Sequence, residues 1–138
     1  MAMFQGSCMC GQVTYRAEAE PLFSGVCHCK DCQRGTGSAF SSVVAVPDAA
    51  LAVTGTPKRH THTGSSGKGV TIAFCAQCGS RLFSQVEVMA GVTMIEAGTL
   101  DDTALFEPQV HIFRDSAQHW FPFTEAMVTF PHMPPMGG

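Results

Sequence analysis

The sequence predicts a mostly β protein, a small assembly of antiparallel sheet built around a structural zinc ion. Three observations favour this class. Short β-branched or alternating segments recur along the chain, and glycine and proline separate them. Two cysteine pairs, far apart in the sequence, can share one metal ion. No window shows a sustained helical period, so little helix is expected.

The expected strands are short, and there are about seven of them. In QVTYRAEA (12–19), Val13, Tyr15 and Ala17 fall on one side of the chain and polar residues on the other. This alternation is typical of a half-buried strand. The remaining strands are expected at residues 41–46, 51–55, 69–75, 81–88, 91–100 and 110–113.

Several connections can also be predicted. Segments 69–75 and 81–88 flank the turn CAQCG and are expected to form the two arms of one hairpin. The segment KRHTHTG (58–64) is expected to be a surface strand, and DDTALF (101–106) a single helical turn.

Length and charge limit the classes of function. The 138 residues suit one domain, and we expect a zinc-binding domain over 1–121 with a proline-rich, extended tail of the same domain over 122–138. The net charge of −3 and the scattered basic residues disfavour a nucleic-acid partner, because nucleic-acid binding needs a basic face. No apolar run reaches the roughly 18 residues of a membrane span, so no membrane association is expected.

The start of the chain also bears on the cysteines. MAMFQGSCMCG lacks the basic region and apolar stretch of a secretory signal, so a cytoplasmic location is expected. The cytoplasm keeps thiols reduced, which makes clustered cysteines better candidates for metal ligands than for disulfides. The odd total of seven cysteines also argues against a disulfide framework.

The turns CMCG and CAQCG predict a closed structural zinc site. Each ends in Cys-Gly, and a glycine at that point can adopt the positive φ that a metal-binding turn requires. Four thiolates complete a tetrahedral site. The predicted ligands are Cys8, Cys10, Cys75 and Cys78. The alternative, four buried reduced thiols, does not explain the two turn-compatible pairs.

A third group, CHCKDC, predicts a different kind of site. Cys27, Cys29 and Cys32 can surround one face of an ion and leave its fourth position open, as in catalytic zinc sites. Two alternatives remain: a closed site completed by a histidine, or a redox pair within CKDC. His28 lies between two ligands and could not close the site without strain. The histidines that could in principle close it are His60, His62 and His111.

The ligand set of the open site constrains its chemistry. Three thiolates leave a divalent ion with a net charge of −1, which makes it a poor activator of water. A soft, open zinc ion suits an additional sulfur ligand, and it can hold an incoming thiol as the reactive thiolate at neutral pH. Addition of a thiol to an aldehyde, or the reverse reaction, is therefore the expected chemistry.

Taken together, the motifs resemble a known family. GSCMCGQVTY, CHCKDCQRGTGSAF, FCAQCGSRLF, AGTLDD and HIFRDSAQHW occur in the order and spacing of the glutathione-dependent formaldehyde-activating enzyme and centromere protein V family. The resemblance covers roughly residues 6–121 and implies the β-tent fold. It implies a structural zinc on the two pairs and a second, catalytic zinc on the triple, which can be under-occupied. The implied activity is that of a carbon–sulfur lyase that forms S-(hydroxymethyl)glutathione from glutathione and formaldehyde.

Residues for substrate binding are harder to predict. Arg34 and Lys30 flank the triple and can meet a carboxylate of a small thiol such as glutathione, or can be solvated charges. Phe40 and Trp120 can wall a pocket, although aromatic residues in β proteins more often belong to the core. Of these, Arg34 and Phe40 are the predicted substrate-binding residues. His111 is interpreted as an ordinary half-buried histidine rather than a proton shuttle.

A rival hypothesis comes from a different class of function. The zinc sites could serve only to stabilise a non-catalytic module that binds a protein or nucleic-acid partner. The short chain and the lack of an obvious acid or base favour that hypothesis, whereas the open triple and the low basic charge disfavour it.

Overall fold

The computed structural model describes residues 2–134 and divides into two compact units. The first unit comprises Met1–Phe23 and Val44–Phe106, and the second comprises Ser24–Val43 and Glu107–Gly138. The chain passes from the second unit to the first within strand β4 (Ser41–Pro47). No helix in the described part of the chain is long and apolar enough to cross a membrane.

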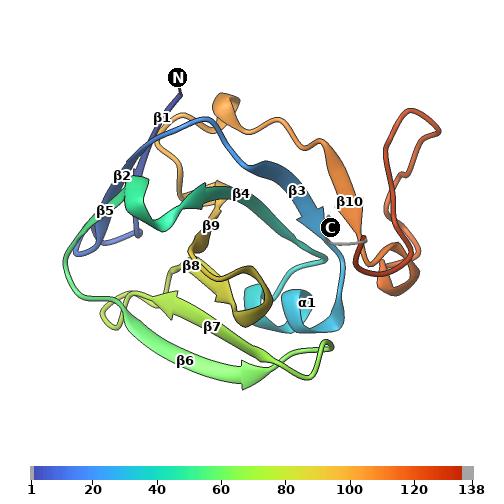
Figure 1. Ribbon diagram of the computed structural model, residues 1–138, viewed down its shortest axis with the longest axis horizontal. Coiled ribbons are helices and arrows are strands. Elements are labelled where there is room, and N and C mark those ends of the chain that lie inside the picture. The colour runs from blue at the N-terminus through green and yellow to red at the C-terminus, as the bar shows by residue number, and fades with distance from the viewer. Residues whose placement is uncertain (1, 135–138) are drawn as a thin grey trace. The chain divides into compact units, whose positions relative to one another are not determined.

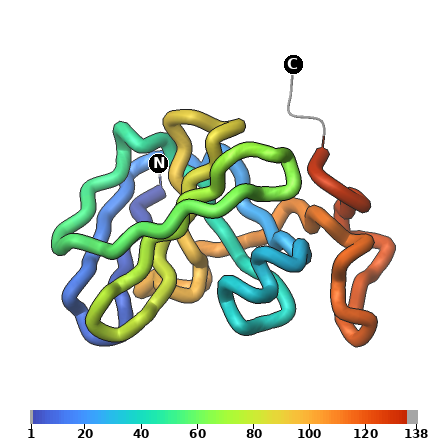
Figure 2. The backbone as a smooth tube through the Cα atoms, turned by 90° about the horizontal axis from the view of Figure 1, so that it is seen from below, coloured from blue at the N-terminus to red at the C-terminus, as the bar shows by residue number. Residues whose placement is uncertain are grey.

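The first unit is built from strands (Figure 1). A three-stranded antiparallel sheet has the order β1-β2-β5, with β1 at Met3–Ser7, β2 at Thr14–Glu18 and β5 at Leu51–Thr54. The other strands follow the order β4-β9-β8-β7-β6, with β6 at Lys58–Thr63, β7 at Gly69–Phe74, β8 at Arg81–Val86 and β9 at Val92–Glu96. Figure 2 shows β6 and β7 running side by side, as their antiparallel register requires.

The structure confirms the predicted fold class and the predicted hairpin. Strands β7 and β8 pair in antiparallel register, with Val70 opposite Val86 and Ile72 opposite Ser84. Strand β6 lies at the edge of its sheet and is exposed along most of its length, as expected for 58–64.

The core of the first unit confirms the predicted alternation. Val13, Tyr15 and Ala17 are buried, while Thr14 and Arg16 between them are exposed. The Tyr15 ring meets the ring of Phe83 edge-on at a centroid distance of 5.2 Å. Two of the predicted metal ligands, Cys8 and Cys75, belong to the buried cluster that contains Tyr15 and Phe83. They are 3% and 2% exposed. The core therefore fixes one cysteine of each pair, whereas Cys10 is exposed and Cys78 is partly buried.

The second unit contains the only α-helix among residues 2–134. Strand β3 (Phe23–Cys27) pairs in parallel with β10 (Val110–Ile112), and helix α1 (Lys30–Thr36) follows β3 after two residues. Strand β10 also pairs with the chain near residue 129, where His111 and Thr129 form a parallel bridge. The His111 N–H donates to the carbonyl oxygen of Val128, and the Phe130 N–H donates to that of His111, both at 2.9 Å. The part of the expected tail near residue 129 is thus tied to β10.

The strands expected over 81–88 and 91–100 are shorter in the structure: they end at Val86 and Glu96, and a 3-10 helix follows each of them. Three further elements differ from the prediction. Strands β1 and β3 were not predicted, because their sequences, MFQGS and FSGVC, each contain a glycine and do not alternate cleanly between apolar and polar residues. Helix α1 was not predicted either. Helix α1 has seven residues, and only Gln33 among them is buried, so no helical apolar period could appear. Its signals are local: Cys29 caps its start, and Gly37 ends it with a φ of 65°.

The remaining regular segments are short 3-10 helices at Asp48–Ala50, Glu87–Met89, Ala97–Thr99, Thr103–Leu105 and Arg114–Ser116. The helical turn expected within 101–106 is among them. The predicted boundary at residue 121 stays a prediction, and residues 135–138 of the expected tail lie outside the described residues.

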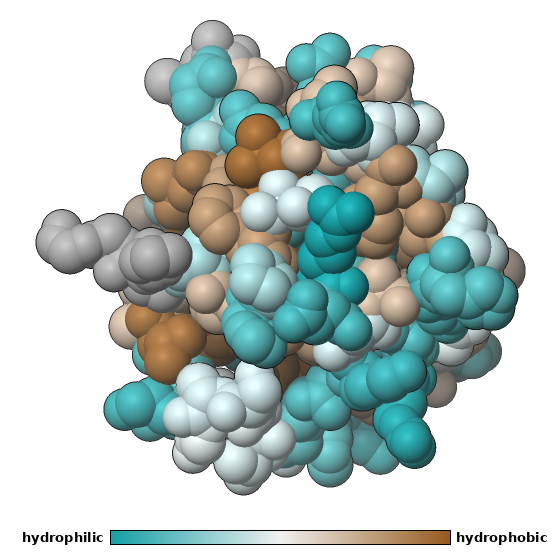
Figure 3. All heavy atoms as spheres, turned by 90° about the vertical axis from the view of Figure 1, so that its right-hand side faces the viewer, coloured by the Kyte–Doolittle hydropathy of each residue, from teal (hydrophilic) through white to brown (hydrophobic). Residues whose placement is uncertain are grey.

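On the face shown in Figure 3, hydrophobic patches lie among hydrophilic side chains.

Candidate metal centres

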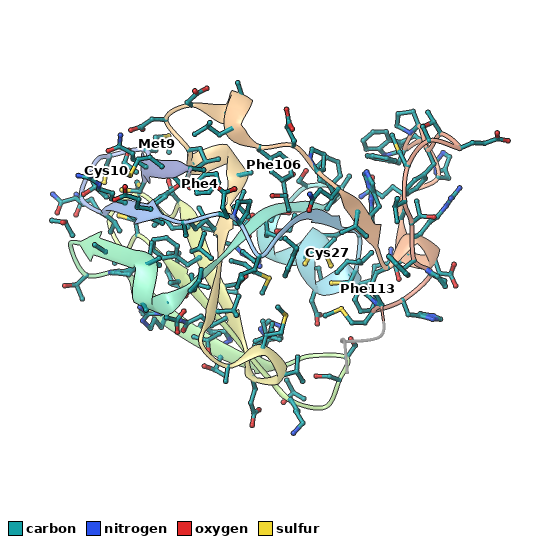
Figure 4. The ribbon with its side chains drawn as sticks, turned by 45° about the horizontal axis from the view of Figure 1, so that its top comes forward. Phe4, Met9, Cys10, Cys27, Phe106 and Phe113 are labelled. Atoms are coloured by element: carbon teal, nitrogen blue, oxygen red, sulfur yellow. The ribbon has the colours of Figure 1, made fainter. Side chains whose placement is uncertain are left out.

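The four-cysteine cluster lies in the first unit, where two turns meet. Cys8 and Cys10 follow β1, and Cys75 and Cys78 lie in the turn between β7 and β8. All four sulfur atoms lie within 4.8 Å of one another. Figure 4 shows Cys10, with Met9 beside it, at the tip of the first turn.

The sulfur spacing of this cluster fits a tetrahedral zinc ion. The Sγ atoms of Cys8 and Cys10 lie 3.6 Å apart, and those of Cys10 and Cys75 lie 3.7 Å apart. A tetrahedron with zinc–sulfur bonds of about 2.3 Å has edges of about 3.8 Å. The predicted ligands therefore come together at distances that one ion can span.

Backbone geometry supports the two turns. Gly11 and Gly79, which follow the second cysteine of each pair, have φ values of 82° and 79°, a region that favours glycine. The N–H of Val13 donates to the Sγ of Cys8 at 3.3 Å. Such donors stabilise thiolates, and they orient the ligands before a metal binds.

Ser80 joins the two turns, and sequence reasoning missed it. Its Oγ accepts a hydrogen bond from the N–H of Met9 at 3.0 Å and lies 3.2 Å from the Sγ of Cys78. The Ser80 hydroxyl, with the backbone N–H of the same residue, lowers the pKa of Cys78 to about 5. A serine two residues after the last ligand carries no signal in the sequence alone.

The three-cysteine cluster lies in the second unit, at the junction of β3 and α1. Cys27 ends β3, Cys29 caps the N-terminus of α1, and Cys32 lies in its first turn. Figure 4 shows Cys27 at the end of its strand. The three sulfur atoms lie within 4.8 Å of one another, and all three residues are partly exposed. Among residues 2–134, no fourth His, Cys, Asp or Glu ligand joins this group.

The local fold explains why these sulfurs converge. In an extended chain, alternate side chains point to the same side, which places Cys27 and Cys29 together and directs His28 to the opposite side. The first turn of α1 then returns Cys32 toward Cys29, and the N–H of Cys32 donates to the Sγ of Cys29 at 3.3 Å. Cys29 also accepts hydrogen bonds from the thiols of Cys27 and Cys32, and these bonds lower its pKa. The group is thus suited to thiolate and metal chemistry.

His28 lies in a buried aromatic cluster behind the cysteines. Its Nε2 and the Nδ1 of His111 are 3.0 Å apart, and the rings of Phe121 and Phe123 lie 4.8 and 5.1 Å from its own. Burial, followed by repulsion from His111 when that ring is protonated, lowers the pKa of His28 to about 4. The pKa of His111 is also lowered, by burial and then by Arg114. Both rings are therefore neutral near pH 7.

The histidines do not complete the metal site. His28 is fully buried and His111 is 6% exposed, so His111 is more buried than the half-buried residue we expected. His60 and His62 lie on β6 in the first unit. None of these residues joins the three-cysteine group.

The structure places Arg34, Phe40 and Trp120, the residues considered for substrate binding, in different environments. Arg34 is exposed in the last turn of α1. Phe40 is partly buried, with its ring 5.7 Å from His28 and 5.6 Å from Phe121. Trp120 is 57% exposed, and its Nε1 donates to the Oε1 of Gln118 at 2.6 Å. Their roles in binding stay predictions.

Comparisons with known proteins agree with this geometry. The chain resembles a solved Rhodobacter sphaeroides protein with a TM-score of 0.54 and 20% identity, over 70% of this chain and 87% of that one. At that identity the likeness is one of fold. No curated protein sequence matches the chain. The model of the glutathione-dependent formaldehyde-activating enzyme family matches residues 3–116, which include both cysteine clusters, and the chain therefore belongs to that family.

Proposed function

We propose that the chain is a zinc-dependent carbon–sulfur lyase that acts on the adduct of a small thiol and an aldehyde. One observation carries the proposal. Cys27, Cys29 and Cys32 converge at partly exposed positions without a fourth protein ligand among residues 2–134, whereas the other cluster supplies four. A closed group of four suits a structural ion, and an open group of three suits a catalytic one.

The two cysteine groups would hold two zinc ions with different roles. Cys8, Cys10, Cys75 and Cys78 would hold the structural ion. Cys27, Cys29 and Cys32 would hold the second ion, the more weakly bound of the two. Zinc bound there would supply a soft, open coordination position at which an incoming thiol is held as thiolate.

The reaction proposed for this site is the addition of glutathione to formaldehyde. A carbon–sulfur bond forms, the thiol proton leaves sulfur, and the carbonyl oxygen of the aldehyde gains a proton. Arg34 is exposed and cationic, and it would meet a carboxylate of the thiol. Phe40 would contact the apolar part of the substrate. Cysteines that bind metal rather than form disulfides are typical of a reducing compartment, so we propose a cytoplasmic location.

Calorimetry with the two-zinc protein tests this function. Glutathione should bind in saturable fashion, compete with mercaptoethanol and release a proton, which titration in two buffers of different ionisation enthalpy would count. Thiol binding should disappear in Cys27→Ala, a variant expected to keep one zinc ion and its fold. If small thiols give no saturable heat, the sulfur-substrate proposal is wrong, and a non-catalytic binding module becomes the better account.

A further inference from the structure

The side-chain amide of Gln33 connects three parts of the second unit. Gln33 is 9% exposed, and its Nε2 donates to the carbonyl oxygen of His28 at 2.8 Å and to that of Ser116 at 2.9 Å. Its Oε1 accepts from the Nε2 of Gln118 at 3.2 Å. Both hydrogens and the oxygen of the amide are therefore used. The two carbonyl acceptors fix the orientation of the amide, because only its NH₂ group can donate to them.

The position of Gln33 in the chain gives these bonds their significance. Gln33 directly follows Cys32, and the carbonyl that it holds belongs to His28, the residue between Cys27 and Cys29. One side chain thus ties the backbone that carries two of the sulfurs to the helix that carries the third. The backbone N–H of His28 is also held, by the carbonyl oxygen of Ile112 at 3.0 Å.

The three-cysteine site requires such a connection. Thiolates that share one ion repel one another, and an open site has no fourth protein ligand to pull them together. A helix as short as α1 is unstable by itself, so its position depends on tertiary contacts. The Gln33 amide supplies a buried contact of this kind immediately beside Cys32.

We propose that Gln33 is a positioning residue for the three-cysteine site: it holds Cys32 at a fixed place relative to Cys27 and Cys29, so that the three thiolates can bind one ion. This inference rests on the proposed function only in taking that site to bind a metal ion. The hydrogen bonds of the Gln33 side chain all go to protein groups, so the role assigned to it is an indirect one. Its effect is on the affinity and symmetry of the site.

The decisive variant is Gln33→Met, which preserves most of the side-chain volume and removes all three hydrogen bonds. We expect the affinity of the second site for zinc to fall about 10-fold to 100-fold, as is usual when residues that orient metal ligands are changed. The four-cysteine site should keep its affinity. Competition of the full-length, two-zinc protein with a chromogenic chelator measures both affinities, and cobalt substitution reports ligand symmetry through the thiolate charge-transfer bands.

Two controls separate positioning from general stability. Gln118→Met removes the bond to the Gln33 oxygen and the bond that Gln118 accepts from Trp120, but it keeps both bonds that Gln33 donates. Its effect on the second site should therefore be several-fold smaller. Gln85→Met removes a comparable bond in the first unit, where the amide donates to Thr93 Oγ1 at 2.9 Å. It should leave the second site unchanged, even if it lowers the free energy of unfolding.

The outcomes are distinct. Loss of zinc from the second site alone, with altered cobalt bands in Gln33→Met, supports the proposal. Unchanged affinity at the second site, or an equal loss at both sites, overturns it. If Gln33→Met does not fold, Gln33→Asn, whose shorter amide cannot reach both carbonyls, replaces it with the same expectation; if that variant also fails to fold, Gln33 is a folding determinant and the proposal is wrong. Failure of the native protein to bind a second metal would instead refute the proposed function.

Discussion

His28 and His111 form a buried histidine pair, with Nε2 of the first 3.0 Å from Nδ1 of the second and the rings stacked at 5.3 Å. One ring must donate the shared hydrogen and the other must accept it. The pair anchors the Cys-His-Cys segment to β10 from the side opposite the sulfurs. In the described structure, Nδ1 of His28 has no hydrogen-bond partner, so the shared bond is the one that the His28 ring makes.

We expect either histidine to be costly to replace alone. His111→Phe should lower the free energy of unfolding by about 1–3 kcal/mol, because it leaves His28 Nε2 buried without a partner. The double variant His28→Phe/His111→Phe should lower the free energy of unfolding by less than the sum of the two single effects, because it removes both polar groups. Urea denaturation of the four proteins in this cycle measures the coupling. Strictly additive losses would contradict the pairing.

The two cysteine clusters should differ in their contribution to stability. Cys75→Ser should lower the free energy of unfolding by on the order of 5 kcal/mol, because the binding energy of a structural zinc ion contributes directly to folding. Cys29→Ser should lower the free energy of unfolding by only about 1 kcal/mol. Cys29 is partly exposed, and the hydrogen bond from the Gln33 amide to the His28 carbonyl also holds its turn. Thermal unfolding with zinc present compares the two variants, and equal losses would contradict the assigned roles.

The Ser80 hydroxyl should slow the release of zinc from the four-cysteine site. Ser80→Ala removes the hydroxyl that accepts from Met9 N–H and lies beside Cys78 Sγ, so zinc should leave that site about 10-fold faster. Ser80→Thr keeps the hydroxyl and should release zinc at close to the native rate. Stopped-flow release into a chelator gives the rates. If alanine and threonine accelerate release equally, the hydroxyl has no such role.

Tyr15 should make the fold sensitive to alkali. Burial, together with the negative charge of Asp101, raises the pKa of Tyr15 to about 12 against the opposing hydrogen bond to Thr99. Between about pH 10 and pH 12, the unfolded chain loses the phenol proton while the folded chain keeps it, so stability falls as the pH rises. Tyr15→Phe should show a flatter decline over this window in denaturation experiments. Because Tyr15 is the only tyrosine, its ultraviolet tyrosinate absorbance reports the ionisation directly.

Gly6 should tolerate no side chain. A Cβ built at this position would overlap the carbonyl oxygen of Thr99 and the Tyr15 hydroxyl, and it would lie 2.7 Å from Tyr15 Cζ. Gly6→Ala should therefore lower the free energy of unfolding by about 1–3 kcal/mol through overpacking. Gly98→Ala is the matched control, because a Cβ there meets no atom within 4 Å. A Gly6→Ala protein as stable as the control would argue against this close approach.

Much of the fold could be predicted from the sequence because its signals are local. The alternation in 12–19 indicates which side of β2 is buried, and the turn between 69–75 and 81–88 indicates a hairpin. Helix α1 could not be predicted in the same way. Its one buried side chain, Gln33, is polar, so the apolar period that normally reveals a helix is missing.

The candidate metal ligands are also predictable, because ligand type and spacing are properties of the chain. Cysteines two or three residues apart can approach one ion through a single turn, whatever surrounds them. The sequence by itself therefore determined the mostly β class, the two cysteine groups and the family. It could not determine which polar side chains support those groups, because their partners are remote in the chain.

The tertiary structure alone decided those partners. His28 meets His111 across 83 positions, Gln33 reaches the carbonyl of Ser116 across the same separation, and Met9 N–H reaches Ser80 across 71. Each contact depends on a strand pairing or a turn that brings distant backbone within hydrogen-bond reach. Hydrogen bonds act over about 3 Å and require alignment, so neither residue type nor local spacing specifies them.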